Sequence, residues 1–220
     1  SYSRNLAVNY LKTKYIASID ADIELTNDWL EKIYNIAKTK NVNFICGKTY
    51  EKYLGNSCNL WRSLRLKQNW GDNDIIDPKF IFGCNNLLDT KDINLIDAYQ
   101  NTGEYFKTNG EDIEFSNRLK KKNFKLYYSS SAICHHLQDD NYKSLSNRYW
   151  RYVRYGDGLK KRNFFKTLKN SFRQLKKTIR WVIEDLYKFR FNLIIVDFFV
   201  LIYFVKNDFI LYLKKNDSDT

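Results

Sequence analysis

Hydrophobic and polar positions along the first part of the chain predict strands that alternate with helices. Apolar residues run almost without a break through Tyr15–Ile19, as in a strand covered on both faces. In the following "LTNDWLEKIYNIAKTK", the apolar residues fall on one helical face, behind Thr26 or Asn27 as the helix cap. A second strand, "VNFICGKTY", comes next. This alternation is typical of an α/β fold with a parallel or mixed sheet.

One segment of the first 140 residues shows no helical or strand-like repeat of its apolar residues. Residues 50–78 are expected to form a long irregular excursion, and such excursions often carry substrate contacts. The pattern predicts six further features: a helix over Arg4–Leu11, a strand "KFIFG", a turn "CNN", a helix near "TKDINLI", a helix from Glu111 to about Lys122, and then a strand "FKLYYSS".

The pattern changes after residue 140, so we expect a catalytic domain over 1–140 and a helical tail over 141–220. Residues 141–190 are basic and aromatic, and "FNLIIVDFFVLIYFVKNDFILYL" follows at 191–213. A membrane span needs about 20 mostly apolar residues, and Asp197 and the "KND" at 206–208 interrupt this run. We therefore predict that this segment attaches to the membrane interface or dips into the bilayer as a short hairpin. The alternative is a pair of amphipathic helices that pack on the catalytic domain.

The formal net charge of +12 changes this picture little, because most of the excess lies between residues 141 and 190. A basic tail next to an apolar segment fits an anionic membrane surface, and no pattern of a nucleic-acid-binding module occurs. The four cysteines have neither the spacing of a zinc site nor the density of a disulfide scaffold. Reduced thiols in the cytoplasm are the expectation.

The first candidate site lies where the strand Tyr15–Ile19 ends in "DAD". Asp20 and Asp22 project the same way from an extended segment, at the carboxyl end of a strand, where open α/β sheets bind ligands. Together they can bind Mg²⁺ or Mn²⁺. These ions take oxygen ligands, and substrate phosphates usually complete their coordination shell. The alternative is a polar turn before the helix cap. "DND" and "DSD" at 72–74 and 217–219 show that the motif alone is weak.

A second acidic pair opens the helix that follows Gly110. Glu111 and Asp112 sit at its N-terminus, where the helix dipole stabilises negative charge, so we expect Asp112 to be ionised. The next strand leads to the only two histidines, His135 and His136. Taken singly, such an acidic pair often only stabilises the helix through its dipole, and such histidines can have no functional role. Their order after Asp-x-Asp, each at the end of an element, favours a site.

The segments "RN", "SIDAD", "FGCNN", "GEDIEFSNRL" and "AICHH", in this order, resemble glycosyltransferase family 2 over roughly 1–136. The resemblance implies the GT-A fold, a Rossmann-like α/β mixed sheet. It also implies roles for individual residues. Asp20, Arg4 and Asn5 contact the nucleotide; Asp22, Asp20 and His135 hold Mn²⁺ or Mg²⁺; Asp112 is the base with Glu111 beside it; and Asn85 and Glu114 line the acceptor side.

By this resemblance the protein is a metal-dependent inverting transferase. It moves sugar from a nucleoside diphosphate sugar to a saccharide or lipid-linked hydroxyl, in surface glycan assembly at the inner face of the cell membrane. The strands that hold the nucleotide base in the family are missing before "RN", so we expect an N-terminally truncated fold or a second chain that supplies them. Two alternatives stay open: an inactive membrane-bound adaptor and a nucleic-acid-binding protein.

Overall fold

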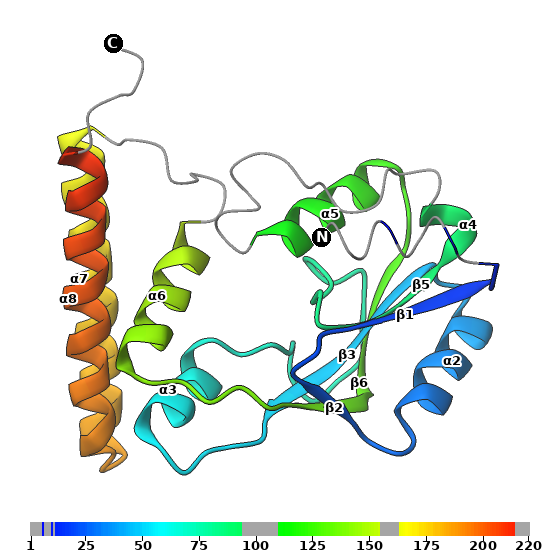
Figure 1. The fold of residues 1–220 in the computed structure, drawn as a ribbon, viewed down its shortest axis with the longest axis horizontal. Helices are drawn as coiled ribbons and strands as arrows, with labels where there is room; N and C mark the ends of the chain where they lie inside the picture. The colour runs from blue at the N-terminus through cyan, green and yellow to red at the C-terminus, as the bar shows by residue number, and fades with distance from the viewer. Residues whose placement is uncertain (1–5, 7–9, 11, 94–109, 155–162, 214–220) are drawn as a thin grey trace. The chain divides into compact units, whose positions relative to one another are not determined.

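The computed structural model describes residues 6, 10, 12–93, 110–154 and 163–213 (Figure 1). The chain forms two compact units, which we call the first unit, residues 1–52 and 67–138, and the second unit, residues 53–66 and 139–220. The predicted boundary after residue 140 lies close to the boundary at Gln138. The structure differs by assigning residues 53–66 to the same unit as the C-terminal helices.

A mixed sheet forms the centre of the first unit, which confirms the predicted fold class. Its strands are β1 (Tyr15–Ile19), β2 (Ile23–Leu25), β3 (Phe44–Glu51), β4 (Ile75–Ile76), β5 (Asn85–Asp89) and β6 (Leu126–His136). Their order is β1-β5-β3-β6-β2, and β4 also pairs with β6. The β3–β6 pair is parallel and the other pairs are antiparallel.

Helices cover both faces of this sheet. The first unit contains α2 (Trp29–Lys40), α4 (Thr90–Ile93) and α5 (Glu111–Lys121). Phe44 and Ile45 are neighbours in β3, so their side chains point to opposite faces. Phe44 packs in a cluster with Phe115 of α5, whereas Ile45 packs in another cluster with Ile33 of α2. The sheet is therefore buried on both sides (Figure 1).

Three local predictions for the first unit are corrected. Within the described residues β1 is an edge strand, half-buried, and not a strand covered on both faces. No strand forms at "KFIFG": Ile81 is buried, but its N–H donates to the Ser116 hydroxyl at 3.0 Å instead of joining a ladder. The segment "CNN" is not a turn throughout, because β5 already begins at Asn85. Most of the predicted helix Arg4–Leu11 lies outside the described residues.

Helices make up the described part of the second unit: α3 (Ser57–Arg65), α6 (Tyr142–Val153), α7 (Phe164–Tyr187) and α8 (Phe191–Leu213). Trp61, Leu145 and Val200 belong to their shared core. None of the helices in the described ranges is long and apolar enough to cross a membrane.

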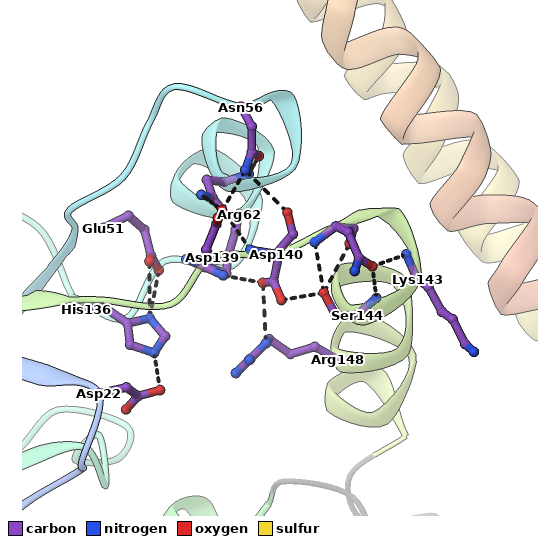
Figure 2. A network of polar contacts seen from close by, with 12 residues as sticks. Asp22, Glu51, Asn56, Arg62, His136, Asp139, Asp140, Lys143, Ser144 and Arg148 are labelled. Carbon is purple, nitrogen blue, oxygen red and sulfur yellow. Dashed lines mark hydrogen bonds and ion pairs between the residues drawn. The ribbon is translucent and has the colours of Figure 1, made fainter.

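The helix α3 was missed because its buried face is partly polar. Asn59 and Arg62 are buried beside Cys58 and Trp61, which hides the apolar period. Their polar atoms are paired: Asn59 donates to Asp139 at 2.7 Å, and Arg62 forms an ion pair with buried Asp140 (Figure 2). A periodicity argument expects apolar residues at such positions and therefore fails here.

Candidate functional site

The Asp-x-Asp segment forms a turn between β1 and β2. The N–H of Asp20 donates to the carbonyl of Cys84 at 3.1 Å, and the N–H of Ile23 donates back to the carbonyl of Asp20 at 3.1 Å. The N–H of Leu137 then donates to the carbonyl of Asp22 at 2.7 Å. The backbone of both aspartates is thus held by segments from elsewhere in the first unit. The turn lies at the carboxyl end of β1, as expected.

A histidine lies between two carboxylates at this turn (Figure 2). Nε2 of His136 is 3.2 Å from Oδ2 of Asp22, and Nδ1 is 3.1 Å from Oε2 of Glu51. The imidazole and the Glu51 side chain are buried, whereas the Asp22 side chain is 44% exposed. Only one carboxylate of this group therefore faces solvent, where a ligand has access.

The donor set at His136 fits a divalent cation. A neutral imidazole carries one N–H, so it donates to only one of its two carboxylate neighbours. If Nδ1 donates to Glu51, the free lone pair of Nε2 and the Asp22 oxygen face the same point. Histidine ligands of metals usually donate their other N–H to a carboxylate in this way. Asp22 and His136 would be the protein ligands and Glu51 the orienting partner.

His135, the histidine expected at the metal, is placed elsewhere. It lies opposite Tyr50 in the β3–β6 ladder, and the two rings stack with centroids 6.5 Å apart. Successive residues of a strand point to opposite faces, so His135 points away from the face that carries His136. The structure brings Asp22 together with His136 and not with His135. No group of three or more His, Cys, Asp or Glu side chains in the described ranges is arranged to hold a metal by itself.

Asp112 opens α5, where its carboxylate has lost most of its contact with water. Desolvation, followed by the charge of Glu111, raises the pKa of Asp112 to about 7. The backbone N–H groups of Ile113 and Gly83 oppose this rise but do not cancel it. We expected the helix dipole to keep the carboxylate ionised, but here burial outweighs it. A carboxylate with such a pKa is a better base near neutral pH than an exposed one.

The segment Phe82–Asn86 connects the two acidic sites. The backbone N–H of Gly83 lowers the pKa of the Asp112 carboxylate, and the carbonyl of the next residue, Cys84, accepts from the N–H of Asp20 at 3.1 Å. The Asn86 amide holds this turn by donating to the carbonyls of Phe82 and Gly83, each at 3.2 Å. Adjacent residues of one turn thereby fix the positions of Asp20 and Asp112.

Asn85, expected on the acceptor side, is fully buried. Its Oδ1 accepts from the indole of Trp29 at 2.7 Å, and its Nδ2 lies 2.9 Å from Sγ of Cys134. Gly47 leaves room for it, because a Cβ there would lie 2.7 Å from the Asn85 side chain. Asn85 thus packs between α2 and the sheet. A contact with the acceptor stays a prediction that this burial does not favour.

The remaining expected site residues are paired elsewhere or lie outside the described ranges. Glu114 forms an ion pair with Arg118, with Oε1 and Nε 2.6 Å apart. Arg4 and Asn5, expected at the nucleotide, are outside the described residues. His136 and Glu51 are the residues that the sequence interpretation missed. The pair of adjacent histidines was the available signal in the sequence. Which of the two lies at the Asp-x-Asp turn depends on the pairing of β6 with β2 and β3.

Comparisons with known proteins agree with the sequence resemblance. Residues 1–97 match the family model of glycosyl transferase family 2. The poly(ribitol-phosphate) beta-N-acetylglucosaminyltransferase TarP of Staphylococcus aureus (strain N315) is 27% identical over 158 residues, which cover 68% of this chain and 47% of TarP. The chain therefore spans about half the length of this relative.

Solved structures also match this chain, and one of them is a transferase complex. The crystal structure of GalNAc-T7 with UDP, GalNAc and Mn²⁺ has a TM-score of 0.44 and 14% sequence identity, and the match covers 79% of this chain and 37% of that one. A likeness at this level has no bearing on the site. The family match includes Asp20, Asp22 and Asn85, and it ends before Glu111 and Asp112.

Proposed function

Because residues 1–97 match the family model of glycosyl transferase family 2, we propose that the protein is a metal-dependent inverting glycosyltransferase. The donor is a nucleoside diphosphate sugar and the acceptor is a hydroxyl of a surface glycan or of a lipid-linked saccharide. The name of the TarP relative supports a polymeric acceptor and an N-acetylhexosamine donor as the first choices to test.

The observation that carries this proposal is the joint placement of Asp20 and Asp112 by the turn at Gly83 and Cys84. One side of the site offers an exposed carboxylate beside an oriented imidazole, and the other offers a carboxylate that exchanges its proton near pH 7. An inverting displacement of this kind uses two functions: ligands for a cation that stabilises the leaving diphosphate, and a base for the acceptor hydroxyl.

In the proposed reaction, Asp112 accepts the proton of the acceptor hydroxyl while that oxygen forms a bond to the anomeric carbon. The bond from this carbon to the diphosphate oxygen breaks, and the diphosphate leaves with the electron pair. A divalent cation, when bound, neutralises the charge that develops on the leaving group. Asp22 and His136 would hold Mn²⁺ or Mg²⁺, and Glu51 orients the imidazole by accepting from Nδ1. Glu111 keeps the pKa of Asp112 raised through its own charge.

The proposed setting is the cytoplasmic side of the cell membrane. The four cysteines are free and buried, which suits a reducing compartment. Neither the adaptor nor the nucleic-acid alternative is favoured by a specific contact in the described residues.

Release of nucleoside diphosphate from a panel of nucleotide sugars, with Mn²⁺ and with a poly(ribitol phosphate) or lipid-linked saccharide acceptor, tests the proposal. Transfer by the wild-type protein and its loss in Asp22→Asn are the expected results. Asp77→Asn is the matched control, because Asp77 is exposed and has a φ of 54°, which asparagine tolerates. Binding of the donor without transfer under all conditions would favour the inactive adaptor instead.

A further inference from the structure

The helix α7 is amphipathic, but its apolar face points to solvent instead of into the core. Large apolar side chains recur along it at spacings of three and four residues, and most of them are exposed, Phe165 by 79%. This stripe consists of Phe165, Leu168, Phe172, Leu175, Ile179, Val182 and Leu186. An apolar face of this kind normally packs against another surface.

The inward face of α7 is polar and already occupied. Gln174 accepts from the hydroxyl of Tyr149 at 2.7 Å, and Asp185 lies 2.9 Å from a guanidinium nitrogen of Arg65. Thr167 and Thr178 are buried on the same side. The outward direction of the apolar stripe is therefore set by specific contacts of the opposite face within the second unit.

The helix α8 extends this apolar surface. It follows α7 directly and packs beside it, as Figure 1 shows. Its acids, which interrupt the apolar run in the sequence, both point inward: Asp197 accepts from the indole of Trp61 at 2.6 Å, and Asp208 pairs with buried Arg154 at 2.9 Å. The outer side of α8 carries exposed Phe191, Ile195, Phe198, Phe199, Ile202, Ile210 and Leu213.

A band of positive charge runs along the stripe on α7. Lys169, Arg173, Lys176 and Arg180 each directly follow a stripe residue, about 100° further around the helix. All four are exposed. The acids of α7 and α8 are inward or paired, since Glu184 contacts Arg65 and Arg190 and the three aspartates are buried. Within the described residues, Glu184 is the one acid of the two helices whose side chain is partly exposed, and it is already paired with three basic residues.

We propose that the outer side of α7 and α8 is an interfacial binding surface for an anionic lipid bilayer, on which both helices lie without spanning it. The apolar stripe would enter the acyl boundary while the basic band contacts the anionic headgroups. A second copy of the same surface is the less suitable occupant, because it would oppose one basic band with another, and the partly exposed acid Glu184 is already paired within its own unit.

Flotation of the full chain with vesicles tests this proposal. Vesicles of phosphatidylglycerol and phosphatidylcholine should bind the protein at low salt, and raising the salt should weaken this binding without abolishing it. The double variant Lys169→Gln/Lys176→Gln should bind about 25-fold more weakly, since each basic residue near an anionic surface contributes about fivefold. Lys121→Gln/Lys125→Gln is the control, because these exposed residues lie in the first unit.

The apolar contribution is tested with Phe198→Ser/Ile202→Ser, which should retain the fold and lose the salt-resistant part of binding. Leu30→Ser, at an exposed position of α2, is its control. Equal binding of all these variants would overturn the proposal, as would a wild-type protein that stays in solution at low salt. The same holds if light scattering without lipid shows a stable oligomer that Phe198→Ser/Ile202→Ser dissociates, since the surface would then bind a second copy.

Discussion

Nε2 of His136 lies 3.2 Å from Oδ2 of Asp22, although 113 residues separate them in the chain. The antiparallel pairing of β2 with β6 places Ile23 opposite His136, and Asp22 directly precedes that pair. The N–H of Leu137 fixes the same region by donating to the carbonyl of Asp22. This short ladder decides which histidine meets the Asp-x-Asp turn.

Replacing the two histidines should therefore have different effects. His136→Ala should weaken Mn²⁺ binding at least about tenfold, because a ligand beside Asp22 is lost, whereas His135→Ala should leave the affinity nearly unchanged. Glu51→Gln should weaken binding about 10- to 100-fold by releasing the imidazole from its orientation. Titration of Mn²⁺ followed by electron paramagnetic resonance measures all three. Equal affinity of the His136 and His135 variants would show that neither ring is a ligand.

Transfer should depend on pH through Asp112. Only the ionised carboxylate accepts a proton, and its pKa is raised to about 7, so the rate should rise with pH through that region. Glu111→Gln removes one cause of the raised pKa and should move the midpoint of the profile to lower pH. Asp112→Asn should lower the rate by about 10²- to 10⁴-fold without weakening donor binding.

Initial rates over a pH series, with donor affinity measured separately by calorimetry, distinguish these effects. If Glu111→Gln leaves the midpoint where it is in the wild type, Asp112 is not the group that the profile reports. A Glu111→Gln protein that loses transfer at every pH would instead give Glu111 a direct role.

Gly47→Ala should destabilise the first unit by about 1–3 kcal/mol, the usual range for an overpacked core. The new Cβ would lie 2.3 Å from the carbonyl oxygen of Ala132 and 2.7 Å from the Asn85 side chain, so β3, β6 or Asn85 must move. Gly55→Ala is the control, since a Cβ there meets nothing within 4 Å. Urea denaturation compares the two free energies of unfolding. Equal stability of both variants would mean that the contact around Gly47 relaxes easily.

Asp208→Ala should lower the free energy of unfolding by about 3–5 kcal/mol, because it leaves the Arg154 charge buried without its main partner. Both side chains are fully buried, and the same carboxylate oxygen of Asp208 also accepts from the indole of Trp150 at 3.1 Å. Asp28→Ala, at the exposed start of α2, should change stability little although it too breaks an ion pair. Thermal unfolding followed by circular dichroism is sufficient for the comparison.

The local pattern of apolar residues predicted where several elements begin and end. β1 occupies Tyr15–Ile19 as expected, and α2 buries Trp29, Ile33 and Ala37 on one face. α5 begins at Glu111, directly after Gly110. These segments carry their own signal, because apolar residues recur at the period of the structure that they form. The same signal failed at α3, where Asn59 and Arg62 are buried by pairing with Asp139 and Asp140.

The order of the motifs along the chain was enough to indicate the family and to place acids at the ends of β1 and the start of α5. Contacts between distant segments decided the rest, because orientation and solvation depend on what packs around a side chain. Strand pairing selected His136 over His135, and desolvation, followed by the charge of Glu111, raised the pKa of Asp112 that the helix dipole alone would lower. In α8, packing against Trp61 and Arg154 turned Asp197 and Asp208 inward, so neither of the acids that interrupt the apolar run in the sequence lies on the outer side.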